Sequence, residues 1–105
     1  MQLMLSKRAV KEISKTEKKT QNAIFDYLKS LENYSETEIY EHGAKDLSGN
    51  LKGLIRFKDK SFITHRLVGT KKEGKLIIML CCEPRNKVYK NKEEMARKSQ
   101  KDKIN

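Results

Sequence analysis

The chain has 105 residues, of which 36% are hydrophobic and 36% are charged, and its net charge at pH 7 is +10. This length allows one domain with a modest core, and the absence of any run near 18 apolar residues excludes a membrane-spanning helix. The first residues, MQLMLSKR, do not fit a secretion signal, because a cation follows the short apolar run instead of preceding a long one. We therefore expect a cytoplasmic protein that does not bind membranes.

The positive charge is concentrated in the second half of the chain. Residues 52–105 contain 16 Lys and Arg against 6 Asp and Glu, whereas residues 1–51 contain 8 of each kind. Such a surplus is typical of proteins that bind a polyanion, either nucleic acid or an acidic protein segment, although surface charge also serves solubility alone.

The N-terminal third predicts a strand followed by two helices. Met1–Leu5 alternates weakly and should join a sheet, and Ser6 is a good N-cap. Apolar residues then recur at helical spacing, which predicts helices over about 7–15 and 17–32, separate or fused into one bent helix, with Thr16 as a second cap. Their common stripe should cover the core face of the sheet: Ala9, Val10, Ile13, Ile24, Phe25, Leu28 and Leu31.

Residues 33–50 form a polar segment, and three short apolar runs follow over 54–58, 62–68 and 76–82. The polar breaks at 59–61 and 70–75 are typical of hairpin turns, so the runs predict an antiparallel three-stranded meander. The last run is apolar on both faces, as in a central strand. Its cysteines, Cys81 and Cys82, are neighbours pointing to opposite faces, so we predict buried reduced thiols.

Alternation along the meander predicts one apolar and one basic face. The core side takes Ile55, Phe57, Ile63 and Leu67, and the opposite face takes Arg56, Lys58 and Arg66, joined after the last strand by Arg85 and Tyr89.

The two histidines are candidate site residues with alternative interpretations. His65 falls on the predicted core face, which favours a buried or half-buried histidine with a hydrogen-bond partner over a catalytic one. His42 lies in the polar segment as a surface residue that can still reach a site. Phosphate-binding, HExxH and paired-cysteine motifs are absent, so we predict no metal and no cofactor.

The C-terminal segment has few apolar residues. Asn91 is a candidate N-cap, followed by Glu93 and Glu94 in a first turn. We expect one domain over residues 1–92 and a basic tail over 93–105, which is either a short, weakly docked helix or partly disordered.

In this order, the elements resemble the RelE/ParE superfamily, the toxins of type II toxin–antitoxin modules. The resemblance rests on S-K-R-A at 6–9, the segment 47–58, H-R-L-V at 65–68, the apolar strand 76–82, and R-x-x-x-Y at 85–89. It implies an α+β fold with an N-terminal strand, an α-hairpin and an antiparallel meander in one twisted sheet, with the helices on one face and a basic concavity on the other.

The resemblance implies one of three functions. RelE-like members cut mRNA in the ribosomal decoding site without a metal, ParE-like members inhibit DNA gyrase without being enzymes, and a third possibility is a relative that only binds nucleic acid. Both toxin classes are silenced by an antitoxin, so a toxin–antitoxin hetero-oligomer is expected. The conserved chemistry of the RelE-like class carries over to five positions as catalytic candidates: Arg56, Lys58, Arg66, Arg85 and Tyr89.

We expect RNA cleavage to proceed by 2′-hydroxyl attack on the neighbouring phosphate, which yields a 2′,3′-cyclic phosphate and a 5′-hydroxyl. Such a reaction needs a base, an acid and cations for the charge on the phosphorane. Lys52, Lys87 and Lys90 are expected to bind the substrate, and the tail lysines to contact ribosomal RNA.

Overall fold

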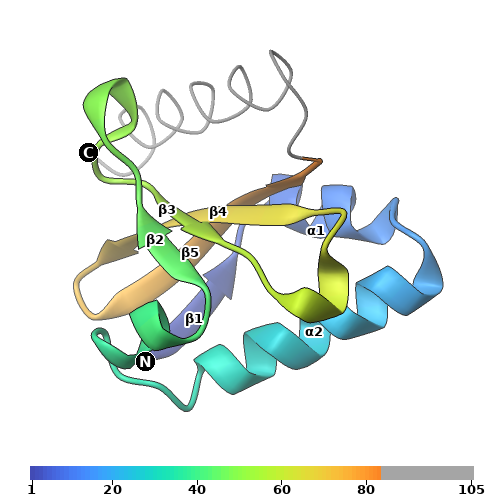
Figure 1. Cartoon of the computed structure of the whole chain (residues 1–105), viewed down its shortest axis with the longest axis horizontal. Coiled ribbons are helices and arrows are strands. Elements are labelled where there is room, and N and C mark those ends of the chain that lie inside the picture. Colours follow the sequence, from blue (N-terminus) through green and yellow to red (C-terminus); the bar gives the residue numbers. More distant parts are fainter. Residues whose placement is uncertain (84–105) are drawn as a thin grey trace.

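The structure is a computed structural model that describes residues 1–83, and in them five strands form one mixed sheet with two helices on one face (Figure 1). Across the sheet the order is β1 (Gln2–Leu5), β5 (Lys75–Cys82), β4 (Arg66–Lys72), β3 (Ile55–Phe57) and β2 (Ala44–Asp46). β1 pairs in parallel with β5, and the other pairs are antiparallel. The predicted α+β fold, with its N-terminal strand and antiparallel meander, is confirmed.

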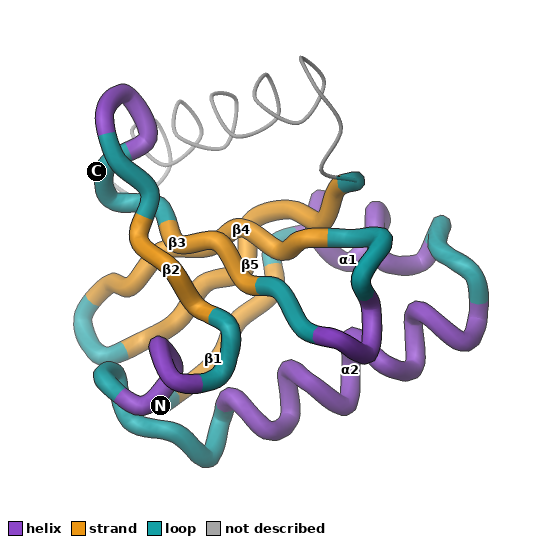
Figure 2. The backbone as a smooth tube through the Cα atoms, in the orientation of Figure 1, coloured by secondary structure: helices purple, strands orange, loops and turns teal. Residues whose placement is uncertain are grey.

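The helices are α1 (Lys7–Ser14) and α2 (Lys18–Leu31), and Figure 2 shows them running beside the strands that cross the centre of the molecule. Three 3-10 segments complete the described part: η1 (Glu38–Glu41), η2 (Gly49–Leu51) and η3 (Lys60–Phe62). In residues 1–83 we find no helix with the length and apolar character needed to cross a membrane.

Local capping separates the two helices. The Ser6 hydroxyl accepts a hydrogen bond from the Ala9 amide at 3.0 Å and donates to the Met79 carbonyl at 2.8 Å, so it caps α1 and ties it to β5. Thr16 donates its hydroxyl proton to the Ile13 carbonyl at 2.7 Å, which ends α1. The N-cap of α2 is therefore Glu17, not Thr16 as the sequence suggested.

The main core lies between the helices and the sheet. It combines Ala9, Ile13, Ile24, Leu28 and Leu31 of the helices with inward-facing residues of the strands: Ile55, Phe57, Leu67, Leu76, Ile78 and Cys81. Two members of the predicted stripe do not belong to it, because Val10 is 46% exposed and Phe25 37% exposed.

The face opposite the helices, which we call the outer face, is partly apolar. A second buried cluster there contains Leu54, Val68, Met79, Leu80 and Cys82. The pairing shifts between Val68, opposite Leu80, and Gly69, opposite Ile78. This bulge leaves Met79 without a cross-strand partner and turns the two neighbours Met79 and Leu80 to the same cluster. As predicted, β5 is a central strand that is buried on both faces.

The second predicted strand, 62–68, is wrong in its first half. Asp59 accepts hydrogen bonds from the amide and hydroxyl of Ser61 at 3.1 and 2.6 Å, which stabilises the 3-10 turn η3, and β4 begins only at Arg66. The turn reverses the expected burial: Phe62 is buried against the Tyr27 ring, with centroids 5.1 Å apart, and Ile63 is 69% exposed. Ile63 is therefore not a core residue.

Strand β2 was not predicted, because residues 44–46 lie in the polar segment. It forms the edge of the sheet, where Ala44 pairs with Phe57 and Asp46 with Ile55. The β4–β5 turn is also tighter than the predicted 70–75 break. Only Glu73 and Gly74 leave the strands, both at positive φ, as a two-residue hairpin requires.

Gly43, just before β2, is packed too closely for a side chain. Its φ is +105°, and a Cβ atom built there would overlap the Lys58 carbonyl oxygen and lie 2.9 Å from the Tyr27 hydroxyl. We expect Gly43→Ala to lower the free energy of unfolding by about 3 kcal/mol or more, because positive-φ strain and a backbone clash add together.

Gly49→Ala is the matched control for this prediction. Gly49 also has a positive φ, of +63°, but a Cβ atom there meets nothing within 4 Å. Gly49→Ala should therefore lower the free energy of unfolding by only about 1 kcal/mol, which is the strain of a left-handed alanine. Urea unfolding of both variants measures the difference, and equal losses would contradict the proposed clash.

Candidate functional site

Four cations lie on the outer face near the β2 edge of the sheet. Lys45 is paired directly with Arg56, and Arg56 is paired on its other side with Val68 of the outer apolar cluster. Lys58 lies two residues after Arg56, and Arg66 lies two residues before Val68. Strand alternation therefore places both cations on the same face. The structure thus gathers Arg56, Lys58 and Arg66 on the predicted face and adds Lys45, which the sequence did not indicate.

Arg56 has an unsatisfied donor. Its Nε atom is buried and has no hydrogen-bond partner. A buried N–H without an acceptor costs free energy. With Lys45 directly opposite, the two like charges also repel each other, and an anion bound between them would relieve that repulsion. Among residues 1–83, no carboxylate forms an ion pair with either cation.

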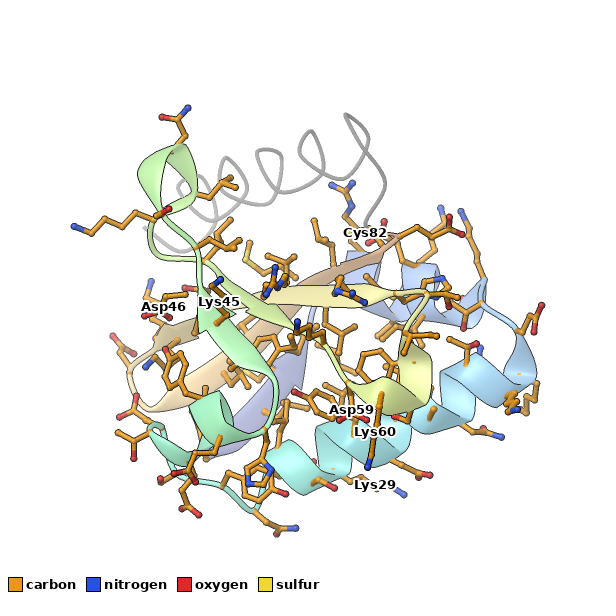
Figure 3. The ribbon with its side chains drawn as sticks, in the orientation of Figure 1. Lys29, Lys45, Asp46, Asp59, Lys60 and Cys82 are labelled. Carbon is orange, nitrogen blue, oxygen red and sulfur yellow. The ribbon has the colours of Figure 1, made fainter. Side chains whose placement is uncertain are left out.

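Lys58 and Arg66 both line a groove of about 480 Å³ where β3 ends and β4 begins. We call it the Lys58–Arg66 groove. Three connections supply its walls: η1–β2, β3–η3 and η3–β4. Its lining residues are Glu41, His42, Gly43, Lys58, Asp59, Lys60, Ile63 and Arg66. Asp59 and Lys60 are labelled in Figure 3, at the start of η3 and above α2.

Arg66 also holds the wall of this groove. Its Nη1 atom donates to the Ile63 carbonyl at 3.0 Å and to the His65 carbonyl at 2.9 Å. A guanidinium has five N–H donors, so these contacts leave others for a ligand. The planar group is held in one orientation, which suits the bidentate binding of a phosphate.

A second depression, of about 360 Å³, lies beside the groove and shares His42 and Asp59 with it. Its lining includes an aromatic stack in which the Tyr34 and His42 rings lie 4.0 Å apart and nearly parallel. The Tyr27 hydroxyl donates to the His42 carbonyl at 2.5 Å. Burial, with a smaller contribution from the charge of Asp59, raises the pKa of Tyr27 well above its usual value, so Tyr27 stays a neutral donor.

Asp46 follows Lys45 but lies on the opposite face of β2, and Figure 3 labels both residues. Its carboxylate accepts a hydrogen bond from the Tyr40 hydroxyl at 2.6 Å, and the Lys71 ammonium lies 4.9 Å from the Tyr40 ring centroid. Partial burial and the bond to Asp46 raise the pKa of Tyr40. This contact braces β2 against η1 and places the Asp46 carboxylate away from the outer cations.

Two other predicted site residues of the described chain, His65 and Lys52, do not line the groove. His65 is half-buried, with its Nδ1 atom 2.8 Å from the Thr64 hydroxyl oxygen, in line with the packing interpretation. Lys52 is exposed where η2 ends. Arg85, Lys87, Tyr89, Lys90 and the tail over 93–105 lie outside the described residues.

Among the groove residues that sequence reasoning missed are Glu41 and Ile63. Both lie in or next to 3-10 turns. Neither strand alternation nor helical spacing therefore predicts which way their side chains point. A signal for Ile63 was present, because Asp59 and Ser61 two residues apart are a pair that caps short turns.

No protein-family model matches the sequence, and no curated protein matches it. Solved structures match in fold. The RelBE2 toxin–antitoxin complex of Mycobacterium tuberculosis matches with a TM-score of 0.64 and 15% identity, over 78% of this chain and 95% of that one. The YoeB dimer of Staphylococcus aureus matches with a TM-score of 0.58 and 22% identity, over 81% and 97%. A YoeB/ParE toxin of Agrobacterium tumefaciens matches with a TM-score of 0.57 and 14% identity, over 81% and 100%. The resemblance is thus confirmed at the level of the RelE-like fold.

Proposed function

We propose that this protein is the toxin of a type II toxin–antitoxin module and that it cleaves mRNA on the ribosome. The observation that carries the proposal is the group of four cations on the outer face, where Lys45 lies opposite Arg56 and Lys58 and Arg66 line the adjacent groove. Four cations on one side of a sheet fit a phosphodiester with its excess charge. The fold shared with RelE-like and YoeB toxins supports this class of protein.

In the proposed reaction the 2′-oxygen of a nucleotide attacks its 3′-phosphate, and the 5′-oxygen of the next nucleotide leaves with a proton. Arg56 and Arg66 hold the non-bridging phosphate oxygens, as guanidinium groups do in a bidentate way. Lys58 or Tyr89 takes the 2′-proton, and Arg85 stabilises or protonates the leaving oxygen. A phenol has an ordinary pKa of about 10, so Tyr89 would need the neighbouring cations to favour its phenolate.

The test is induced expression of the chain in a bacterial host, followed by two assays of the purified protein. Primer extension on mRNA from a cell-free translation reaction should show new 5′ ends, and a parallel supercoiling assay should show unchanged gyrase activity. Gyrase inhibition without new mRNA ends would favour the ParE-like alternative. Binding of RNA with neither effect would leave only a nucleic-acid-binding relative.

We also propose an acidic or amphipathic antitoxin segment as the neutralising partner, motivated by the surplus of ten positive charges in residues 52–105. Two of the matching structures are toxin–antitoxin complexes. The on-rate of the copurified antitoxin should fall steeply as salt rises from about 0.05 to 0.3 M, because screening removes electrostatic steering.

Stopped-flow or surface-binding kinetics measure this on-rate. Lys58→Ala should weaken the salt dependence, and Lys19→Ala on the exposed side of α2 serves as a control of equal charge change. An on-rate that does not respond to salt would contradict the charge-steered partner.

A further inference from the structure

Ile63 stands out among the apolar residues of the described chain. It is 69% exposed, more than Met4, Val10 and Phe25, which are the other large hydrophobic side chains exposed in residues 1–83. Single exposed apolar residues are common on protein surfaces. Ile63 differs from the other three because it lines the Lys58–Arg66 groove.

The backbone around Ile63 is fixed from both sides, so its exposure does not come from a frayed loop. Before it, Asp59 caps η3, and Phe62 is buried in an edge-to-face contact with Tyr27. After it, Arg66 bonds the carbonyl groups of Ile63 and His65. Its own φ and ψ, −63° and −20°, are unstrained. The fold therefore presents an apolar side chain at a fixed place beside two cations.

We propose that Ile63 is a base-contacting residue that packs against the face of the nucleobase next to the phosphate bound by Lys58 and Arg66. This inference rests on the proposed function, since it takes single-stranded RNA as the ligand of the groove. A nucleotide offers an anionic group and an apolar face within one unit, and cations and an apolar side chain together line the groove. Every base has such a face, so the contact adds affinity without reading the sequence.

The contact has a distinct consequence for binding. Cations recognise the phosphate of any nucleotide, with or without its base, whereas Ile63 recognises only the base. Removing the Ile63 side chain should therefore weaken binding of RNA about tenfold, the usual scale for one buried aliphatic contact, and leave binding of the bare backbone unchanged.

The experiment compares two fluorescent ligands of equal length, a single-stranded RNA and an abasic ribose-phosphate oligomer, by fluorescence anisotropy at low salt. Ile63→Ser should bind the RNA about tenfold more weakly and the abasic oligomer as tightly as the unchanged protein does. Ile63→Leu keeps an aliphatic side chain and should bind the RNA as tightly as the unchanged protein does. Lys58→Ala should weaken both ligands to a similar extent, and Val10→Ser, an exposed apolar residue on α1, should weaken neither.

The outcomes separate this inference from the proposed function. If Ile63→Ser binds RNA as tightly as the unchanged protein, or loses both ligands equally, the base contact is wrong, while cleavage in the translation assay still tests the function. If the unchanged protein binds neither ligand and cuts no mRNA, the proposed function fails and the inference fails with it. Circular dichroism of Ile63→Ser should match the unchanged protein, as expected for a side chain on the surface.

Discussion

Arg66→Ala should abolish growth inhibition and lower mRNA cleavage by about 100- to 1,000-fold, the usual effect of losing one donor to a transition-state charge. The Arg66 side chain has two roles, and the substitution removes both of them. Arg66 brings a cation to the groove beside Lys58, and its Nη1 atom fixes the η3–β4 connection through the carbonyls of Ile63 and His65. Induced expression measures the toxicity, and primer extension measures the cleavage.

Two further variants separate the roles of Arg66. Arg66→Lys keeps the charge but cannot hold both carbonyls and a phosphate in one plane, so it should recover only part of the activity. Lys19→Ala removes an exposed cation from α2 and should remain fully toxic. A well-expressed, folded Arg66→Ala protein with undiminished toxicity would overturn the placement of the site on the outer face.

Efficient mRNA cleavage should occur only during translation, so we expect a large difference in cleavage rate between samples with and without translating ribosomes. In residues 1–83, Ile63 is the sole large apolar side chain of the groove, and the Tyr34–His42 stack lines the neighbouring depression. Free RNA would thus be held mainly by a few cations, weakly at physiological salt. Correct positioning is worth several kcal/mol of barrier, that is, a rate factor of about 1,000 or more. We propose that the ribosome supplies it.

The measurement compares one transcript with and without translating ribosomes, at equal protein concentration. Cuts should appear at fixed positions relative to codons with ribosomes and should be at least about 1,000-fold slower without them. A translation inhibitor that leaves the mRNA free provides the control. Equal cutting of the two samples would identify a free ribonuclease, in which the cations of the outer face position the RNA themselves.

The sequence by itself determined the features that depend on near neighbours. Helical spacing and the Ser6 cap predicted α1 and α2, and apolar runs predicted three strands of the sheet, with β5 as an interior strand buried on both faces. Period-two alternation predicted that Arg56 and Arg66 share a face, because a strand turns every second side chain to the same side. These signals act over a few residues, so the sequence carries them directly.

Only the tertiary structure decided the surroundings of the site. Phe62 packs against the Tyr27 ring of α2, and the neighbouring Ile63 is exposed where half of a strand was expected; the alternation of 62–68 gave no sign of this packing. The short strand β2 has little hydrophobic signal of its own, since β3 supplies its pairing, and it brings Lys45 opposite Arg56. His42 reaches the groove because Gly43 passes against the Lys58 carbonyl. Such contacts join residues far apart in the chain, where packing outweighs local preference.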